Sequence, residues 1–349
     1  MIYRTPEYCR DFRCKAGECR DSCCKGWEID IDTETAEKYA AVSGDFGKRL
    51  QNSIKNGSFL LIEDERCPFL NENGLCDIYI NLGEENLCHI CSEHPRYYEW
   101  FGNVKEGGVG LCCEAAAELI LSSPFTLCEE QIADDYSEDE YDEELFGILL
   151  EARTAMLNIL NNSDIPLDTA LCHILDNAED LQEELDLDFP VFSGNADCSD
   201  GLHRIFRIFA ELEPIDENWL PFVKSCEKSL SQAPPHKTEH TPYLRRIASY
   251  LIFHYFLKSV YDGRILGYTM FAAVSVLFID CLFRCKAVEN GSCCFSDCAE
   301  LAKNYSKETE YSEENMEKLL DLFETEPAFG VELLKKLLTE AFGKNVDDI

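Results

Sequence analysis

The chain has 349 residues with 31 basic and 67 acidic side chains, so its formal net charge at pH 7 is −36. A protein this acidic repels nucleic acid phosphates and anionic membrane surfaces, which excludes both as expected partners. Hydrophobic residues make up 46% and charged residues 28% of the sequence, which is typical of a globular protein long enough for two domains.

Cysteine is the unusual residue type in the first part of the chain. There are 20 cysteines, and 11 of them lie between Cys9 and Cys113. The N-terminal residues contain no apolar stretch typical of a secretory signal, so we expect a cytoplasmic protein with reduced thiols. Cysteines gathered in such a chain indicate metal or redox chemistry rather than a disulfide framework. The sequence therefore predicts a cysteine-rich metal-binding module over residues 1–128.

An acidic block follows the module from Glu129 to Glu144, with ten acids and no base. A block of like charge is usually solvated and loosely ordered. We therefore interpret it as a linker or as the beginning of the next domain, and divide the chain into residues 1–128 and residues 129–349.

The second domain is expected to be all-helical, because apolar residues recur there at spacings of three and four. The predicted helices cover 145–160, 166–172, 202–212, 243–261, 265–283, 313–323 and 331–342. The uncharged run from Ile265 to Ile279 has 15 residues. This is short of the roughly 20 residues that span a membrane, so it predicts a buried core helix. The stripe Tyr250, Phe253, His254, Phe256 and Leu257 likewise predicts core packing.

Strand signals are weak throughout, and the best short one runs from Phe59 to Ile62. The predicted fold class is therefore mainly α. We expect the cysteine-rich metal-binding N-terminal module to pack on the all-helical C-terminal body.

Eight cysteines of the module are the candidate metal ligands. Thiolates prefer zinc, copper(I) or iron–sulfur clusters, and four of them can hold one zinc ion or one cubane cluster. The module has one clean CxxC pair, whereas zinc ribbons show two such pairs about 15 to 20 residues apart. Scattered cysteines favour an iron–sulfur site over zinc. The candidates are Cys14, Cys19, Cys23, Cys24, Cys67, Cys76, Cys88 and Cys91.

A second group of cysteines lies late in the chain and leaves two interpretations open. It could form a second metal site, or it could consist of buried or redox-sensitive thiols. Isolated cysteines elsewhere are expected to be small buried hydrophobic residues. The late group is Cys281, Cys285, Cys293, Cys294 and Cys298, and the isolated ones are Cys128, Cys172, Cys198 and Cys226.

The order of several motifs resembles the flagellin lysine-N-methylase (FliB-type) family over almost the whole chain. The similarity begins with the Cys14 to Cys24 spacing followed by Gly26-Trp27. It continues through Cys67-Pro-Phe-Leu, Gly-Leu-Cys76, Cys88-x2-Cys91, Pro95-Arg96 and Cys112. It ends with 250–263 and the 305–315 motif that contains Glu308 and Glu310. The module alone is also similar to small cysteine-cluster proteins described as zinc- or iron-chelating.

This resemblance implies a protein lysine N-methyltransferase. The methyl donor would be S-adenosylmethionine, the substrate flagellin, and the metal centre a [4Fe–4S] cluster rather than zinc. A positively charged sulfonium and a lysine both suit an acidic pocket, which we expect where the module meets the helical body. Arg96 is the candidate for holding the donor's carboxylate through a bidentate pair. The sequence identifies no catalytic residue and no Rossmann-type glycine motif.

The alternative interpretation is a metal- or iron–sulfur-binding protein without enzymatic activity, with a storage, redox or sensing role. The two groups of cysteines and the missing donor-binding motif favour this alternative. Donor binding and methyl transfer to a lysine-rich protein would distinguish the two functions.

Overall fold

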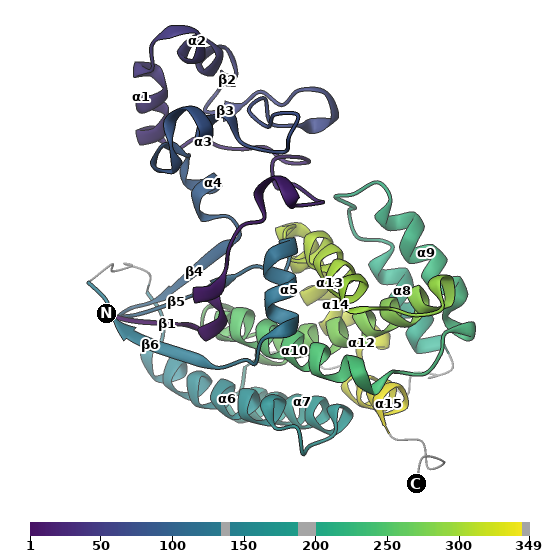
Figure 1. Ribbon diagram of the computed structural model, residues 1–349. Helices are drawn as coiled ribbons and strands as arrows, with labels where there is room; N and C mark the ends of the chain where they lie inside the picture. Colours follow the sequence, from purple (N-terminus) through teal and green to yellow (C-terminus); the bar gives the residue numbers. More distant parts are fainter. Residues whose placement is uncertain (134–139, 188–199, 344–349) are drawn as a thin grey trace.

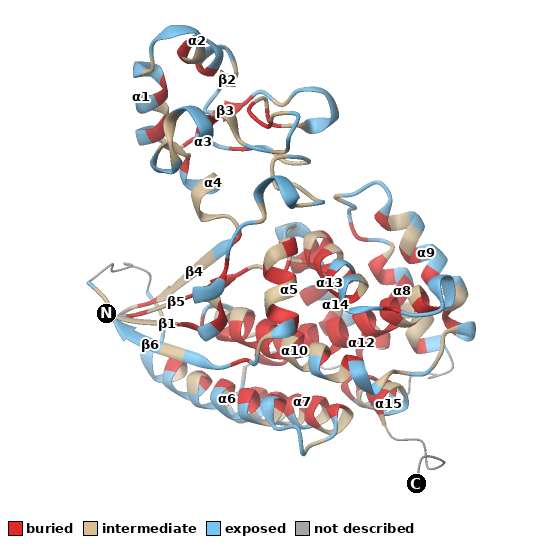
Figure 2. Cartoon of the chain, viewed as in Figure 1, coloured by how far each residue is buried: buried red, intermediate tan, exposed pale blue. Residues whose placement is uncertain are grey.

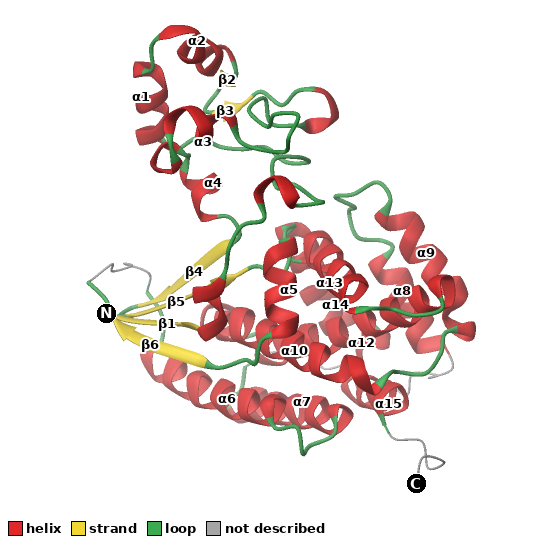
Figure 3. Ribbon diagram, viewed as in Figure 1, coloured by secondary structure: helices red, strands yellow, loops and turns green. Residues whose placement is uncertain are grey.

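The described chain consists of a small cysteine-rich part and a larger, mostly helical body. The structure is a computed structural model that describes residues 1–133, 140–187 and 200–343. The cysteine-rich part stands on the body at the top of Figure 1. Helices dominate the body, and its larger sheet lies at one edge (Figure 3). The predicted fold class, mainly α with an N-terminal cysteine-rich module, is confirmed.

Helices make up most elements of both parts. The cysteine-rich part contains α1 (Thr33–Ala41), α2 (Gly44–Asn52), α3 (Asp77–Leu82) and α4 (His89–Glu93). The body contains α5 (Glu114–Ser122), α6 (Glu143–Asn161), α7 (Leu167–Glu184), α8 (Gly201–Phe209), α9 (Trp219–Ser229), α10 (Thr241–Tyr255), α11 (Ser259–Asp262), α12 (Ile265–Asn290), α13 (Phe295–Thr309), α14 (Glu313–Thr325) and α15 (Val331–Phe342). Short 3-10 helices add η1 (Glu7–Asp11), η2 (Ala16–Glu18), η3 (Glu63–Glu65), η4 (Glu84–Asn86), η6 (Leu230–Gln232), η7 (Thr238–His240), η8 (Phe256–Lys258) and η9 (Pro327–Phe329).

Most predicted helices of the body are present, and three others were not predicted. Helices α7 and α12 are longer than predicted and continue to Glu184 and Asn290. The helices that were not predicted are α5, α9 and α13. Helix α13 begins with a capping box in which the Cys294 thiol accepts from a backbone N–H, while the Asp297 carboxylate accepts from the Cys294 N–H at 2.8 Å. Cysteine is not among the residues preferred at this position, so the signal was not recognised.

A four-stranded sheet forms one side of the body, and the sequence did not predict it. Its order is β4-β5-β1-β6, with β1 parallel to β5 and the other pairs antiparallel. Strand β6 lies within the segment predicted to be a loosely ordered acidic linker, so that prediction is wrong for residues 129–131, while 134–139 lie outside the described residues. Apart from the β4–β5 hairpin, the strands pair over long sequence separations, which local patterns do not reveal. They are β1 (Ile2–Pro6), β4 (Arg96–Phe101), β5 (Val104–Val109) and β6 (Leu127–Gln131).

A small hairpin replaces the strand expected from Phe59 to Ile62. It consists of β2 (Ile54–Lys55) and β3 (Ser58–Phe59). Asn56 and Gly57 join them with φ angles of 54° and 88°. This Asn-Gly pair is the preferred sequence of a type I′ turn, in which both central residues need positive φ.

Two separate hydrophobic clusters divide the protein (Figure 2). The smaller cluster contains Ile29, Tyr39, Phe69 and other residues of the cysteine-rich part. The larger cluster includes residues from both ends of the chain, and Phe12 and Phe101 belong to it. The N-terminal strand and β4 to β6 therefore pack with the helical body, and the division of the chain at residue 128 stays a prediction.

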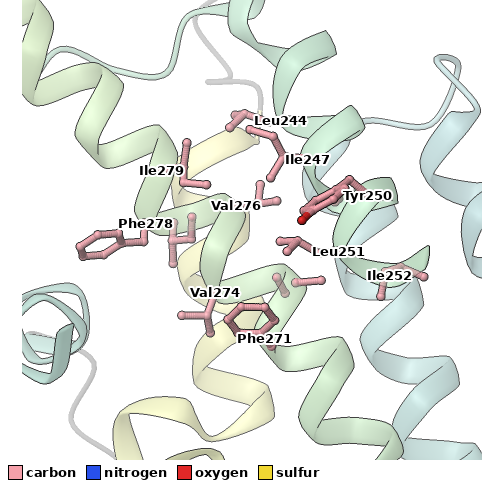
Figure 4. Packing of buried hydrophobic residues seen from close by; sticks show 14 of the residues in the cluster. Leu244, Ile247, Tyr250, Leu251, Ile252, Phe271, Val274, Val276, Phe278 and Ile279 are labelled. Atoms are coloured by element: carbon pink, nitrogen blue, oxygen red, sulfur yellow. The ribbon is translucent and has the colours of Figure 1, made fainter. Parts of the chain in front are cut away.

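Helix α12 is the centre of the helical body. It is buried on all sides because α7, α10, α13 and α14 surround it. Apolar side chains of α10 and α12 point toward one another (Figure 4). Among the described residues, α12 is the one helix long and apolar enough to cross a membrane, but its most apolar window is wholly buried inside the protein. The predicted core helix is thus confirmed, and the stripe on α10 packs beside it.

A buried ion pair joins the sheet to the helices. Arg153 of α6 and Glu106 of β5 form two hydrogen bonds of 2.6 and 2.5 Å, and their side chains are 1% and 4% exposed. Arg153 also donates to the Phe253 carbonyl of α10 at 3.1 Å, and Arg4 of β1 bonds Glu106 at 3.1 Å. These contacts satisfy both buried charges, which would otherwise destabilise the fold.

Candidate functional site

Five of the eight predicted ligands lie close together inside the cysteine-rich part. We call this set the inner thiol group. Burial raises the pKa of Cys67 to about 12, with neighbouring Cys24 and Cys76 adding to the shift. The pKa of Cys91 is raised by its hydrogen bond with Cys88, by burial and by the thiols of Cys24 and Cys67. These mutual effects place the five thiols within electrostatic range of one another. The inner thiol group is Cys24, Cys67, Cys76, Cys88 and Cys91.

Backbone hydrogen bonds hold the inner thiol group together. The N–H of Cys67 donates to the carbonyl of Cys24 at 2.8 Å, which joins two segments 43 residues apart in the chain. The N–H of Cys91 donates to the carbonyl of Cys88 at 2.9 Å at the start of α4. A hydrogen bond from Cys23 lowers the pKa of the Cys24 thiol to about 7, so this thiol ionises easily.

The other three predicted ligands belong to a second set, the outer thiol group. It contains Cys14, Cys19 and Cys23 together with Cys113, which is not among the eight predicted ligands. Burial raises the pKa of Cys113, and the nearby thiols of Cys19 and Cys14 raise it further. The pKa of Cys23 is raised by its hydrogen bond with Cys24, by burial, and by Cys24, Cys14 and Cys113. The outer thiol group lies between the module and the start of α5, where Cys113 is the N-cap residue.

The chemistry of the inner thiol group fits a soft metal centre. It offers more than the four thiolates that a zinc ion or a cubane cluster needs, and it lies in an apolar cluster. In the part of the chain that the structure describes, no three His, Cys, Asp or Glu side chains are already arranged around a common point. The structure thus brings the predicted ligands together in two groups without deciding which four bind metal.

Ion pairs fasten the cysteine-rich loop to the helical body. Glu114 of α5 bonds Lys15 at 2.8 Å and the Arg20 side chain at 3.2 Å. Burial alone would raise the pKa of Glu114. Hydrogen bonds from Lys15 and from the backbone N–H of Arg20, together with the positive charges of both side chains, instead lower this pKa to about 2. Asp21 bonds Lys303 of α13 at 2.7 Å and lies 3.4 Å from Lys307. The module is therefore docked on α5 and α13 through charged contacts.

Stacked aromatic rings form the next layer of this junction. Trp27 of the module stacks on Tyr311, which follows α13, with ring centroids 4.8 Å apart and planes 14° apart. The Tyr311 hydroxyl lies 2.6 Å from Nδ1 of His94, and burial lowers the pKa of His94 to about 4. Lys307 lies 5.7 Å from the centre of the Trp27 ring. Trp27 thus lies at the contact between the two parts.

A buried carboxylate surrounded by tyrosines lies in the helical body beside this junction. Glu310 accepts hydrogen bonds from Tyr250 at 2.7 Å and from Tyr255 at 3.0 Å. Burial raises the pKa of Cys112 well above its ordinary value, and the charge of Glu310 raises it further, so this thiol lies near the carboxylate. The sequence placed Glu310 in a closing motif but did not identify it as a functional residue. Both partners lie on α10, and Tyr250 belongs to the stripe that was predicted to be core packing.

An acidic cavity of about 260 Å³ lies on another side of α13. Two of its lining residues also contact the module, because Glu300 pairs with Arg20 and Lys307 with Asp21. The Trp219 indole N–H, at the cavity, has no hydrogen-bond partner among the described residues. The charged residues of the lining are Asp216, Asp297, Glu300, Glu308, Lys286 and Lys307. The cavity therefore lies beside the contact between α13 and the module, and its use as a reaction site stays a prediction.

Arg96 is the first residue of β4 and takes no part in the backbone hydrogen bonds that hold the inner thiol group together. Its guanidinium lies 5.3 Å from the centre of the Phe12 ring and 3.5 Å from the Ser92 carbonyl. Within the described ranges the Arg96 guanidinium forms no ion pair with a carboxylate, so its N–H groups can donate to a ligand. Its role in donor binding is not decided by this geometry and stays a prediction.

Three of the five late cysteines, Cys285, Cys293 and Cys298, lie in close thiol pairs, and both interpretations of the late group stay open. The sulfur atoms of Cys293 and Cys298 are 3.5 Å apart, and both side chains are buried. Cys285 lies beside Cys226 and donates to its carbonyl at 3.5 Å. No described group of three metal-binding side chains includes these residues. Cys198 lies outside the described residues.

Comparison with known families matches both parts of the chain. A family model described as the FliB lysine N-methylase C-terminal domain matches residues 197–337, which include α8 to α14 and therefore Glu310. A second family model, for a zinc- or iron-chelating domain, matches residues 13–107, which include all eight predicted ligands.

Three curated proteins of Salmonella are similar over part of the chain. The lysine-N-methylases of Salmonella choleraesuis and Salmonella typhimurium are each 32% identical over 133 residues, which is 34% of this chain and 32% of theirs. The flagellar biosynthetic protein FliU of Salmonella muenchen is 31% identical over 133 residues, which is 76% of its length. The chain thus aligns with about a third of the length of the lysine-N-methylases, and no solved structure matches it.

Proposed function

The chain belongs to the FliB lysine N-methylase family, and from this premise we propose that it is a protein lysine N-methyltransferase with flagellin as its substrate. We further propose that S-adenosylmethionine is the methyl donor and that the cysteine-rich module carries a [4Fe–4S] cluster. Family membership supports the reaction class, and the flagellar name of one relative supports the substrate.

The junction between the module and the helical body is the observation that carries this proposal. There the thiol groups, the Glu310 carboxylate and the acidic cavity lie on adjoining elements. A lysine ammonium and a sulfonium are both cations, so carboxylates at this junction stabilise both reactants. A purely metal-storing module does not need an acidic region on the helical body.

Methyl transfer to a lysine requires a neutral amine and a group that accepts its proton. The lysine nitrogen must lose a proton before it can act as a nucleophile. The new C–N bond then forms as the C–S bond of the donor breaks, and S-adenosylhomocysteine leaves. Buried surroundings favour the neutral amine over the ammonium, and a carboxylate can accept the proton.

The metal centre is proposed to lie in the inner thiol group. Its ligands would come from Cys24, Cys67, Cys88 and Cys91, with Cys76 as the further candidate, because the Cys91 thiol lies within electrostatic range of the other three. If only three of these thiolates bound a [4Fe–4S] cluster, its fourth iron would be open and would supply a binding position for the amino and carboxylate groups of the donor. Arg96 is proposed to hold that carboxylate as well.

Anaerobic purification followed by a methyl-transfer assay tests the proposal. We expect a brown protein with iron and sulfide that transfers labelled methyl groups from S-adenosylmethionine to flagellin lysines. Flagellin whose lysines have been chemically methylated beforehand is the control acceptor. A colourless protein containing zinc would contradict the cluster. A protein that binds metal but neither binds the donor nor transfers methyl groups would support the non-enzymatic alternative.

A further inference from the structure

Glu310 carries a buried charge that the protein itself leaves incompletely paired. Its side chain is 4% exposed. One carboxylate oxygen, Oε2, accepts from Tyr250 and Tyr255, whereas Oε1 has no hydrogen-bond partner among the described residues. A buried polar atom without a partner destabilises a fold, and more so when it is charged. One explanation for such an atom is a ligand that donates the missing hydrogen bond.

No described cation compensates this carboxylate. The nearest basic group is His254, whose Nδ1 lies 3.8 Å from Oε2. Burial lowers the pKa of His254 below its ordinary value, so the imidazole is neutral at pH 7. The His254 ring is stacked between Tyr97 and Tyr255, with centroid distances of 3.5 and 4.0 Å. Among the described residues, the Glu310 carboxylate therefore has no positively charged partner.

Aromatic rings lie around the carboxylate on two elements. Tyr97 comes from β4, and Tyr250 and Tyr255 come from α10. The Tyr97 hydroxyl is also buried without a hydrogen-bond partner among the described residues. Aromatic faces attract ammonium groups, and rings combined with a carboxylate are the usual means of binding methylated amines.

We propose that Glu310, Tyr97, Tyr250 and Tyr255 form the binding site for the side-chain nitrogen of the acceptor lysine and of its methylated product. This inference rests on the proposed function and assigns the acceptor position within it. The free oxygen of Glu310 takes one N–H of the ammonium, and the tyrosine rings contact the last methylene groups and the methyl group that is added.

The chemistry of the site favours an ammonium over other cations. A guanidinium is recognised by two parallel hydrogen bonds, but here one oxygen is already occupied by two tyrosines. Calcium and magnesium need six or more oxygen ligands, and one free carboxylate oxygen does not supply them. A sulfonium has no N–H and would leave Oε1 without a hydrogen bond.

The position of the site connects it to the cysteine-rich module. Cys112 lies beside both Glu310 and the hydroxyl of Tyr311. Tyr311 is 41% exposed and stacks on Trp27 of the module. An acceptor lysine would therefore reach Glu310 past Cys112 and Tyr311, next to the outer thiol group.

Glu308 on the same helix provides a matched comparison. It is also buried, at 2% exposure, but its two oxygens accept from the backbone N–H groups of Ile215 and Asp216 at 2.7 and 2.8 Å. Glu308 thus fastens the 213–216 loop, whereas Glu310 leaves one oxygen free. The two residues should respond differently to the same substitution.

The test compares Glu310→Gln with Glu308→Gln in the full-length, metal-loaded protein. The probes are Nα-acetyl-lysine amide and its ε-dimethylated form, measured by calorimetry, with S-adenosylmethionine binding and metal content measured in parallel. Glu310→Gln should weaken binding of both probes at least tenfold, keep donor binding and metal, and melt at the same temperature as the unchanged protein or higher. Glu308→Gln should melt lower.

The inference is overturned if Glu310→Gln binds the probes as tightly as the unchanged protein does, or if the unchanged protein binds neither probe. It is also overturned if the melting temperature of Glu310→Gln drops as much as that of Glu308→Gln, because Glu310 would then be structural. Methyl transfer that persists in Glu310→Gln contradicts this inference alone. Probe binding that depends on Glu310 in a protein without methyl transfer contradicts the proposed function alone.

Discussion

Trp27 and Tyr311 stack with their ring planes 14° apart, although 284 positions separate them in the chain. Trp27 is tied to the cysteines, because its indole N–H donates to the Cys23 carbonyl at 2.7 Å. Tyr311 directly follows Glu310. This single contact therefore links the thiol groups of the module to the tyrosine-lined carboxylate of the helical body.

Trp27→Ala should loosen the docking of the module without removing its metal. Aromatic pairs contribute about 0.5–1.5 kcal/mol beyond their buried area, so the whole protein should remain folded. We expect faster hydrogen exchange at residues 14–27 and at least tenfold slower methyl transfer. Trp100→Ala, on β4 of the sheet, is the control and should leave exchange in 14–27 unchanged. Normal methyl transfer by Trp27→Ala would show that the stacking is not needed.

Cys67→Ser and Cys91→Ser should each lower the metal content and the melting temperature together. Metal binding energy contributes to folding when the site forms only in the folded chain. Cys172→Ser, in the helical body, is the control and should keep both. Metal analysis and a thermal melt of each variant check this expectation. A Cys67 variant that keeps full metal and a normal melt would remove Cys67 from the ligand set.

Docking of the cysteine-rich loop should depend on pH below about 4.5. The pKa of Glu114 is lowered from an ordinary value of 4.5 to about 2, and the Lys303 and Lys307 contacts lower that of Asp21 despite its burial. A lowered pKa stabilises the folded state above the unfolded value, and this contribution is lost as pH falls toward 2.

Hydrogen exchange at residues 14–21 measures this dependence between pH 5 and pH 2. Protection should decrease over that interval, and Glu114→Gln should already be less protected at pH 5 and respond less to acid. An identical pH response in Glu114→Gln would assign the acid sensitivity to other groups.

Val274→Asp should destabilise the helical body by on the order of 4 kcal/mol, because Val274 is fully buried in α12 and burial of a charge among apolar side chains is costly. Val274→Ala is the milder control, since it removes volume without adding charge. Denaturant unfolding measures both variants. An unchanged midpoint for Val274→Asp would mean that this part of α12 is accessible to water.

Arg96→Ala should abolish binding of S-adenosylmethionine while iron content stays the same. Arg96 has no carboxylate partner among the described residues, so its loss leaves no buried charge unpaired. Arg10→Ala, at an exposed neighbouring position, is the control for general loss of positive charge. Calorimetry with the donor and iron analysis give the two readouts. Loss of iron together with donor binding would mean that Arg96 supports the module, and unchanged affinity would exclude it from the donor site.

Local patterns in the sequence were sufficient for part of this protein. The density of cysteines predicted the metal-binding module, and the uncharged run from Ile265 to Ile279 predicted the core helix that became α12. Both signals are local, because ligand-rich loops and buried helices show their character in neighbouring residues.

Only the tertiary structure decided which residues act together. Tyr250 and Glu310 are 60 positions apart, and each alone has an ordinary sequence context. The sheet likewise pairs Ile2 with Val104 and Gln131. The division of the cysteines into two groups depends on such pairings too, because spacing along the chain does not report distance in space. Long-range contacts form only when the whole chain packs, so no local pattern encodes them.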